Sequence, residues 1–115
     1  MLGVKGSTIK GHLDMLVLSV LAAGPLHGYA VIEELKTRSG DSFDLPEGTI
    51  YPVLHRLEKE GLLASAWSEA AGRRRRTYTL TRAGKGALVE QRRAWQAFSD
   101  AVGRVLGGAP WPAKI

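Results

Sequence analysis

The spacing of the apolar residues changes at Gly61, and this change restricts the possible folds more than any other feature of the sequence. In residues 46–60 the apolar side chains recur at i, i+3, i+4 and i+7, which is the spacing of one helix face. These positions are Ile50, Val53, Leu54 and Leu57. Beyond Gly61, residues 62–68 and 75–80 are rich in Trp, Tyr and Thr and are separated by the turn-like stretch 69–72. The sequence therefore predicts a helix followed by a β-hairpin.

Two further helices are expected before this one, and a long helix after the hairpin. Residues 10–23 and 28–39 have apolar positions at helical spacing, and Thr81 is a suitable N-cap for a last helix that extends to about Leu106. The result is a mainly α fold with a small β-hairpin, a winged helix-turn-helix with one added helix. In such a fold the helices 28–39 and 46–60 are the helix-turn-helix pair, and the second is the recognition helix that enters the major groove of DNA.

This order divides the chain of 115 residues into three parts. Residues 1–80 are expected to form a winged helix-turn-helix DNA-binding domain, residues 81–106 a dimerisation helix, and residues 107–115 a C-terminal tail. A chain of this length has room for one compact domain and an appended helix, so a two-domain enzyme is not expected.

The positive charge is concentrated in one short stretch. The net charge is +5, and Arg73–Arg76 together with Arg82 account for it, because the other Lys and Arg residues balance the 11 Asp and Glu residues. A basic block on an otherwise balanced protein indicates contact with a polyanion, above all a nucleic acid. The alternatives are an anionic lipid as the polyanion, or a solvated loop or tail address that makes no such contact.

The composition favours a cytoplasmic protein. The sequence has no Cys, which excludes disulfides and Cys-based zinc sites. The apolar run 15–23 follows two lysines, as in a secretory signal, but Asp14 adjoins it, Pro25 follows it and its spacing is helical. No stretch approaches the roughly 18 apolar residues of a membrane-spanning helix, so we expect no membrane partner.

The sequence lacks the residue patterns of an enzyme. His12, His27 and His55 are too dispersed for a metal site at helical spacing, and His27 is better suited to a structural hydrogen bond in its turn. Gly84–Gly86 lacks the rest of a phosphate-binding loop, and no serine stands in a G-x-S-x-G turn. We therefore expect no catalytic activity, no cofactor and no metal.

Three stretches of the chain carry a recognisable pattern. Residues 10–35 read KGHLDMLVLSVLAAGPLHGYAVIEEL, residues 47–63 read EGTIYPVLHRLEKEGLL, and residues 72–84 read GRRRRTYTLTRAG. In order and spacing they resemble the PadR-like transcriptional regulators, winged-helix repressors named after a member that responds to phenolic acids. The resemblance implies a DNA-binding repressor, and the short ending with a single helix resembles the smaller members of that family.

The surface of the recognition helix opposite its apolar face is the predicted DNA-contacting surface. A step of about 100° per residue puts Gly48, Pro52, His55 and Lys59 there, flanked by Thr49, Tyr51 and Arg56. The hydroxyl groups of Thr49 and Tyr51 can donate to phosphates. The side-chain cations of Arg56 and Lys59 can contact phosphate or base. The predicted DNA-binding residues of this helix are Thr49, Tyr51, His55, Arg56 and Lys59. As alternatives, Tyr51 is a half-buried aromatic packed against the wing and His55 a simple surface residue.

Pro52 conflicts locally with a helix. It has no N–H, and its ring clashes with the carbonyl of Gly48. If the helix begins near Glu47, Pro52 lies just beyond the first turn and the damage is limited. Leu45 and Pro46 stand where many relatives have a serine-like N-cap, so the sequence leaves the exact start of the helix open.

The arginines of the hairpin cannot all face one groove of DNA, because successive residues of a strand point to opposite faces. We predict that Arg73 and Arg74, nearest the tip, enter a narrow minor groove, where they sense groove width and A·T content. Trp67 and Tyr78 are expected to be packing residues of the core or between strands rather than platforms on which bases stack.

The last helix predicts a homodimer. Its apolar residues follow a heptad-like 3-4 spacing that one winged domain cannot cover, and twofold pairing would match an inverted-repeat operator in double-stranded DNA. The interface residues are Leu88, Gln91, Trp95, Phe98, Val102 and Val105. The resemblance also implies a small aromatic effector between the dimer's helices, for which we expect contacts from Leu16, Trp95 and Phe98. The alternative role of Trp95 is interface packing.

These observations favour a dimeric, sequence-specific DNA-binding transcriptional regulator, a repressor released by a small aromatic effector. The alternative is a winged-helix interaction module that binds RNA or a protein partner without operator specificity.

Overall fold

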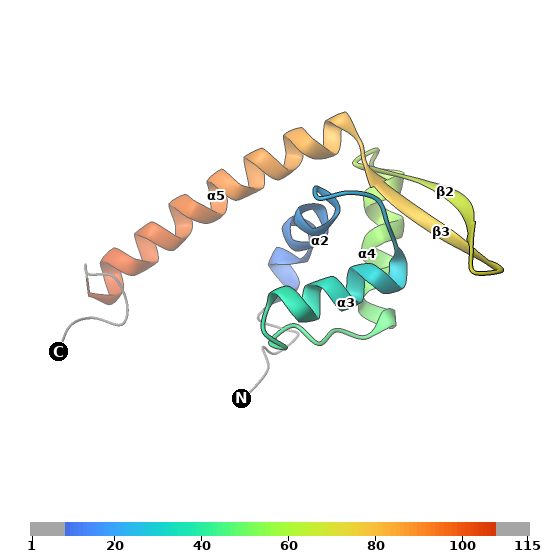
Figure 1. Ribbon diagram of the computed structural model, residues 1–115. Helices are drawn as coiled ribbons and strands as arrows, with labels where there is room; N and C mark the ends of the chain where they lie inside the picture. Colours follow the sequence, from blue (N-terminus) through green and yellow to red (C-terminus); the bar gives the residue numbers. More distant parts are fainter. Residues whose placement is uncertain (1–8, 108–115) are drawn as a thin grey trace.

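A computed structural model describes residues 9–107 of the chain (Figure 1). The predicted order of three helices, a hairpin and a long helix is confirmed, and so is the mainly α winged helix-turn-helix fold. The tail predicted at 107–115 lies, except for Gly107, outside the described residues. The elements are η1 (Lys10–His12), α2 (Leu13–Leu21), β1 (Leu26–His27), α3 (Gly28–Arg38), α4 (Glu47–Lys59), β2 (Leu63–Ala70), β3 (Arg73–Leu80) and α5 (Arg82–Leu106).

The first helix is shorter than the predicted 10–23. Its first residues form the 3₁₀ turn η1, because His12 leaves the α-helical region with φ −121° and ψ 0°. At the other end α2 stops at Leu21, and Gly24 then adopts a φ of 152°, which side chains rarely allow. Pro25 follows and cannot continue a helix.

The sheet has three antiparallel strands in the order β1-β3-β2, so β3 is the central strand. The two-residue strand β1 was not predicted, since two residues are too short for any alternation to be visible; Leu26 pairs with Tyr78 and His27 with Thr77. The hairpin strands are longer than predicted. The turn between them is only Ala71 and Gly72, both at positive φ, as tight hairpin turns require.

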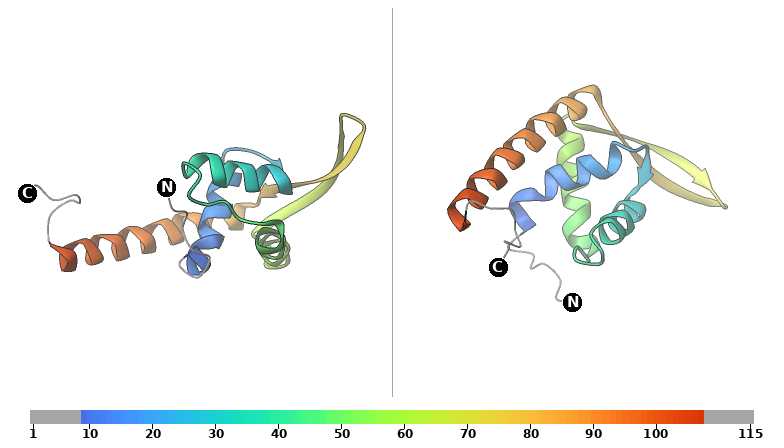
Figure 2. Two further views of the ribbon diagram at one scale, coloured as in Figure 1. Left: turned by 90° about the horizontal axis from the view of Figure 1, so that it is seen from below. Right: turned by 60° about the vertical axis from the view of Figure 1, so that its left-hand side comes forward.

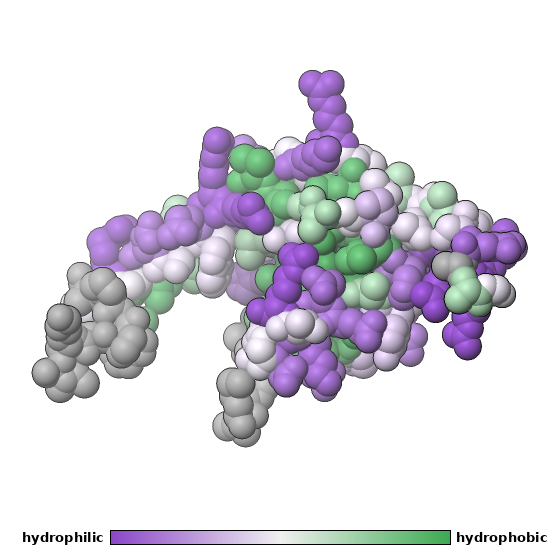
Figure 3. Space-filling view, viewed as in Figure 1, coloured by the Kyte–Doolittle hydropathy of each residue, from purple (hydrophilic) through white to green (hydrophobic). Residues whose placement is uncertain are grey.

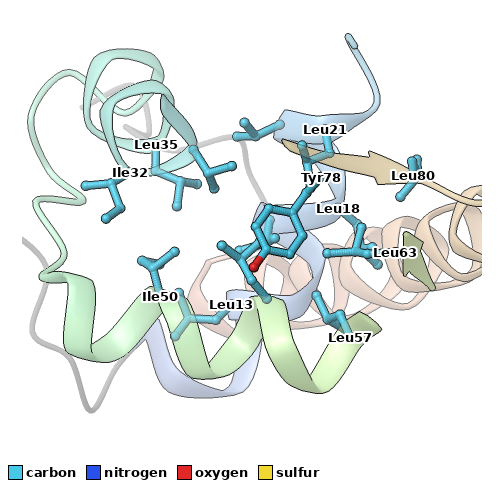
Figure 4. Packing of buried hydrophobic residues seen from close by; sticks show 14 of the residues in the cluster. Leu13, Leu18, Leu21, Ile32, Leu35, Ile50, Leu57, Leu63, Tyr78 and Leu80 are labelled. Carbon is cyan, nitrogen blue, oxygen red and sulfur yellow. The ribbon is translucent and has the colours of Figure 1, made fainter. Parts of the chain in front are cut away.

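The core lies where α2, α3 and α4 meet the base of the sheet. Tyr78, only 1% exposed, reaches from β3 into the middle of this cluster, as Figure 4 shows. Its neighbours in the cluster include Leu18 and Leu21 of α2, Leu35 of α3, and Ile50, Leu54 and Leu57 of α4. The periodicity of residues 46–60 therefore identified the core side of α4 correctly, with Val53 half-buried at its edge.

The start of α5 is fixed to the end of α4 and to the sheet. The side chain of Thr81 caps the helix by accepting from the N–H of Gly84 (3.0 Å) and donates to the carbonyl of Gly61 (2.7 Å). Leu88, further along the same helix, is buried in the core. The second half of α5 then runs away from the other elements (Figures 1 and 2), which gives the molecule its extents of 56 × 32 × 22 Å.

Gly84 is expected to be essential for this junction, whereas Gly86 is not. A Cβ on Gly84 would collide with the carbonyl oxygen of Leu62 and lie 2.8 Å from Leu80 Cδ1, while a Cβ on Gly86 meets nothing within 4 Å. Gly84→Ala should lower the free energy of unfolding by about 1–3 kcal/mol, because overpacking forces backbone shifts. Urea denaturation measures the change.

Gly86→Ala is the matched control on the same helix. It should raise the free energy of unfolding by about 0.5–1 kcal/mol through helix propensity alone. Equal midpoints for the two variants would contradict the proposed role of Gly84.

Candidate nucleic-acid interface

The outward face of α4 is exposed as helical geometry predicts. Gly48, Pro52, His55 and Lys59 are all exposed, and Thr49 is half-buried. The helix begins at Glu47 after Pro46, which has no capping side-chain hydrogen bond, and the N–H groups of Thr49 and Ile50 bond to the Pro46 carbonyl. Pro52 thus falls in the second turn, and the carbonyl that loses its helical donor belongs to Gly48, an exposed residue.

Arg56 lies on this helix but its charge is already engaged. Its guanidinium forms two hydrogen bonds to the carboxylate of Asp14 on α2 and a third, 3.2 Å long, to Glu60. These carboxylates raise the pKa of Arg56 above its usual value. By contrast, Lys59 has no carboxylate within ion-pair distance among residues 9–107. Any contact of Arg56 with DNA must therefore compete with Asp14.

Tyr51 is a residue of α4, and its side chain lies near the start of α3 and the wing. A Cβ on Gly28 would lie 2.6–2.8 Å from the Tyr51 ring and hydroxyl, so the ring packs directly on the backbone of Gly28. Partial burial, and secondarily the charge of Glu47, raise the pKa of Tyr51. The alternative of a half-buried aromatic therefore describes Tyr51 well, although its partner is α3 as much as the wing.

The strand register divides the wing arginines between two faces. Trp67 pairs with Arg76, and Glu69 with Arg74, so Arg74 and Arg76 share one face of the hairpin while Arg73 and Arg75 share the other. Grouping Arg73 with Arg74 was therefore wrong as a matter of orientation: all four belong to β3, and neighbours on a strand point apart. In the space-filling view the wing end of the molecule is predominantly hydrophilic (Figure 3).

Trp67 holds two arginine side chains on its ring. The guanidinium carbon of Arg74 lies 4.7 Å and that of Arg76 5.5 Å from the ring centroid, within the range of cation–π attraction. Trp67 is 55% exposed and so is not a core residue; its ring packs against arginines of the neighbouring strand. Tyr78, by contrast, is buried in the core. Both agree with the packing roles expected from the sequence.

A hydrogen-bond network ties this face of the wing to the end of α4. Arg76 Nε donates to Ser65 Oγ (2.8 Å), Ser65 Oγ donates to Glu58 Oε2 (2.5 Å), and Arg76 Nη2 lies 3.4 Å from the same oxygen. The Ser65 hydrogen bond, followed by the nearby Arg76 charge, lowers the pKa of Glu58. Sequence reasoning missed Glu58 and Ser65, which carry no motif; their only signal is an acid near the end of a recognition helix in an arginine-rich protein.

The opposite face of the wing borders a hollow of about 300 Å³. It is lined by His27, Gly28, Tyr29, Tyr51 and the arginines Arg73–Arg76. His27 caps α3, because its Nδ1 accepts from the N–H of Ala30 at 3.3 Å, so the expected structural hydrogen bond of this histidine is confirmed.

The predicted seam of α5 is only partly free. Leu88 is 5% exposed and belongs to the core of its own protomer, so placing it in a dimer interface was wrong. Gln91 is half-buried, whereas Trp95, Phe98, Val102 and Val105 are exposed, Phe98 at 58% and Val105 at 86%. The spacing could not separate the two sets, because one heptad row continues from the core into solvent.

Trp95 and Phe98 border a second hollow of about 350 Å³ between α5 and the start of α2. Trp95 meets the ring of His12 edge-on at 5.1 Å and lies 6.2 Å from the ring of Phe98. The structure does not bring Leu16 to this hollow, since Leu16 lines a different depression with Phe43 and Leu35. A helix presents residues 15 and 16 to different sides, and it is Met15 that lines the hollow at Trp95.

Within residues 9–107 no group of three or more His, Asp or Glu side chains could hold a metal ion. In the same part of the chain no helix is both long and apolar enough to cross a membrane.

Comparison with known proteins identifies the family. The sequence model described as "Transcriptional regulator PadR-like family" matches residues 17–90, which include α3, α4, the wing and the start of α5. The chain belongs to this family. It is accordingly a DNA-binding transcriptional regulator; regulators of this family are typically dimeric and generally are not enzymes.

Individual relatives agree. The transcriptional regulator Rv3488 of Mycobacterium tuberculosis is 41% identical over 99 residues, covering 86% of this chain and 87% of that protein. A PadR family transcriptional regulator from Eggerthella lenta superimposes with a TM-score of 0.78 at 35% identity, over 90% of this chain and 88% of the other. A transcriptional regulator from Clostridium thermocellum gives a TM-score of 0.79 at 26% identity, over 85% and 96%.

The network around Glu58 predicts a pH-dependent contribution to stability. Because folding lowers the pKa of Glu58 from its usual value near 4.5, its contribution is complete above that pH and is lost as the pH falls through the folded pKa. Glu58→Gln should therefore lower the free energy of unfolding by about 0.5–1 kcal/mol at pH 7, the range of a solvent-accessible pair, and by less at pH 4. Urea denaturation at both pH values measures this.

Glu33→Gln is the control, because Glu33 is exposed and has no ion-pair partner among the described residues. It should change stability little at either pH. A Glu58→Gln effect that is the same at pH 7 and pH 4 would refute the role of the ionised carboxylate.

Proposed function

We propose that the protein is a cytoplasmic, homodimeric repressor that binds an inverted-repeat operator, with α4 in the major groove and the wing at the minor groove. The observation that carries this proposal is the distribution of unpaired charge. Of the four wing arginines, only Arg76 has a carboxylate within ion-pair distance among residues 9–107, whereas Arg38 and Arg56 on the helices are paired. Cations left without partners on one projecting hairpin, next to an exposed recognition helix, suit a polyanion.

The DNA-binding residues we propose are Thr49, Tyr51, His55, Arg56, Lys59, Arg73 and Arg74, the last two contacting DNA from opposite faces of the wing. Among these, His55 and Lys59 lie on the exposed face of α4 and are best placed to read base edges. Arg74, held over Trp67, has a restricted side chain and so loses less entropy on binding than a free one. Arg56 becomes available to DNA only when a phosphate or base replaces Asp14.

We propose residues 1–80 as the DNA-binding unit and 81–106 as the dimerisation helix, with Leu88 assigned to the former's core. The interface residues are Gln91, Trp95, Phe98, Val102 and Val105, together with Leu106, which is 74% exposed. So many large apolar side chains on one projecting helix are costly to leave in water, which favours burial against a second copy. A twofold pair would present its two recognition helices about one DNA turn (~34 Å) apart.

Selection of bound duplexes from a random DNA pool tests the function. The protein should enrich one inverted-repeat sequence and bind it at least about 10³-fold more tightly than random DNA at equal salt. Equal affinity for selected and random duplexes, or tighter binding of RNA, would instead support the interaction module without operator specificity.

The selected duplex also tests the dimer. Phe98→Ala with Val102→Ala should shift sedimentation toward the monomer and weaken operator binding. Val89→Ala, which truncates an exposed residue of α5 outside the seam, is the control and should change neither property. Monomeric wild-type protein at micromolar concentration would contradict the proposal.

The hollow beside Trp95 is our proposed effector site, for a small planar aromatic ligand. Three aromatic rings, those of His12, Trp95 and Phe98, border it, and ring faces bind flat apolar ligands well. A ligand there could change the angle between the two α5 helices and thereby the separation of the recognition helices. Such coupling is reciprocal: if the ligand weakens DNA binding, commonly about 5- to 150-fold, DNA weakens ligand binding by the same factor.

Tryptophan emission tests this site. In a background with Trp67→Phe and Trp111→Phe, of which Trp111 lies outside the described residues, Trp95 reports alone. Planar aromatic compounds should quench its emission and lower operator affinity in the same background. Quenching that Phe98→Ala leaves unchanged, or that has no effect on operator affinity, would leave Trp95 as a packing residue.

A further inference from the structure

The hollow between the wing and the start of α3 has an unusual lining. The arginine segment Arg73–Arg76 borders it together with two tyrosines and His27, and none of its eight lining residues is acidic. Of these arginines, Arg73 and Arg75 belong to this face of the strand, whereas the guanidinium groups of Arg74 and Arg76 lie over Trp67 on the other face. It is a surface depression of about 300 Å³, large enough for a phosphate group and the sugar atoms attached to it.

The two arginines on this face of the wing lack acidic partners. Arg73 and Arg75 have no carboxylate within ion-pair distance among the described residues, whereas Arg76, on the other face, pairs with Glu58. A paired arginine has its donors occupied. An arginine without a carboxylate keeps a fork of N–H donors whose geometry matches a phosphate.

The contact between Arg75 and His27 lacks one acceptor. Arg75 Nη1 lies 2.8 Å from His27 Nε2, while His27 Nδ1 accepts from the Ala30 N–H at 3.3 Å. A neutral imidazole accepts at one nitrogen only, so Ala30 and Arg75 compete for a single lone pair. The α3 cap at Nδ1 requires the proton on Nε2; in that tautomer Nε2–H and the Arg75 N–H are two donors that face each other, and an anion would accept from both.

We propose that this hollow holds one phosphodiester group of the DNA backbone, bound by Arg75 and His27 Nε2–H, with the hydroxyl of Tyr29 at the rim. This inference rests on the proposed DNA-binding function and adds a contact that neither α4 nor the wing tip supplies. Tyr51 borders the same hollow from α4, so an anion held there is next to the recognition helix. That continuity favours a phosphate of the bound duplex over a free phosphate ion, which would gain no second contact.

The contact would be independent of sequence and would fix how the wing sits relative to α4. Phosphate contacts position a protein on a duplex, and base contacts then read the sequence. Because His27 is the N-cap of α3 and Arg75 belongs to β3, one phosphate would join the helix-turn-helix to the wing from the face opposite the Glu58–Arg76 network. The wing would then be held from both of its faces when DNA is bound.

Scanning the selected operator with single methylphosphonate linkages tests this phosphate site, since each linkage removes one backbone charge. For the wild-type protein, one neutral linkage per half-site should weaken binding roughly tenfold, the worth of a charged hydrogen bond. In Arg75→Ala the same linkage should have a much smaller effect, and the slope of log affinity against log salt should fall by about 0.9 for each of the two phosphates, one per half-site, that are no longer neutralised. Arg75→Lys should restore the salt slope but only part of the affinity, because it lacks the fork.

Arg104→Ala, an exposed arginine of α5 far along the chain from the wing, controls for the loss of one positive charge. In Arg104→Ala, the neutral linkage that weakens operator binding by the wild type should weaken binding by the same factor. Arg75→Ala should unfold thermally at the same temperature as the wild type, which establishes that its fold is intact. Arg75→Ala that remains sensitive at every linkage at which the wild type is sensitive would overturn the proposal, even though operator preference, and with it the proposed function, still held.

Competition with inorganic phosphate distinguishes a DNA backbone phosphate from a free phosphate ion as the occupant of the hollow. At matched ionic strength, phosphate should weaken operator binding no more than chloride does, because the site gains its affinity from the duplex. Stronger inhibition by phosphate that disappears in Arg75→Ala would overturn the DNA backbone as the occupant and assign the hollow to a free anion.

Discussion

The central strand β3 is the element on which the rest of the structure depends. It pairs with β1 on one side and β2 on the other, and the face that carries Tyr78 and Leu80 into the core carries Arg74 and Arg76 at its outer end. A one-residue slip of its register would move the core residues to solvent and exchange the arginines between the two faces. Burial of Tyr78 therefore sets both the stability of the domain and the direction in which each wing cation points.

Sequence periodicity located the helices and the core side of α4 because those features are local. The cap at Thr81 and the breaks at Gly24 and Gly61 were visible for the same reason, since each depends on the chemistry of one or two residues. The strand β1 could not be predicted, because its two residues are held only by pairing with a strand far along the chain. The extension of β3 through the arginines was hidden too, since charged residues have no strand preference of their own.

The errors at the candidate site have one cause, which is that spacing along an element does not say what covers it. Leu88 and Phe98 belong to the same heptad row, yet the core of the domain covers the first and leaves the second exposed. Leu16 and Met15 are neighbours in the sequence, but only Met15 reaches the hollow at Trp95. Likewise, nothing in the spacing of α4 indicates that its arginine at position 56 meets an aspartate forty-two residues earlier.

That last contact joins two regions that the sequence treated as separate. Asp14 lines the hollow bordered by Trp95 and Phe98, and the same carboxylate binds Arg56 on the recognition helix. A carboxylate that is hydrogen-bonded to a guanidinium has few lone pairs left for a second cation. The proposed effector site and the proposed DNA-binding surface therefore share one acidic group within a single protomer. Any change that draws Asp14 toward the hollow acts on Arg56 directly, whether or not the angle between the two α5 helices changes.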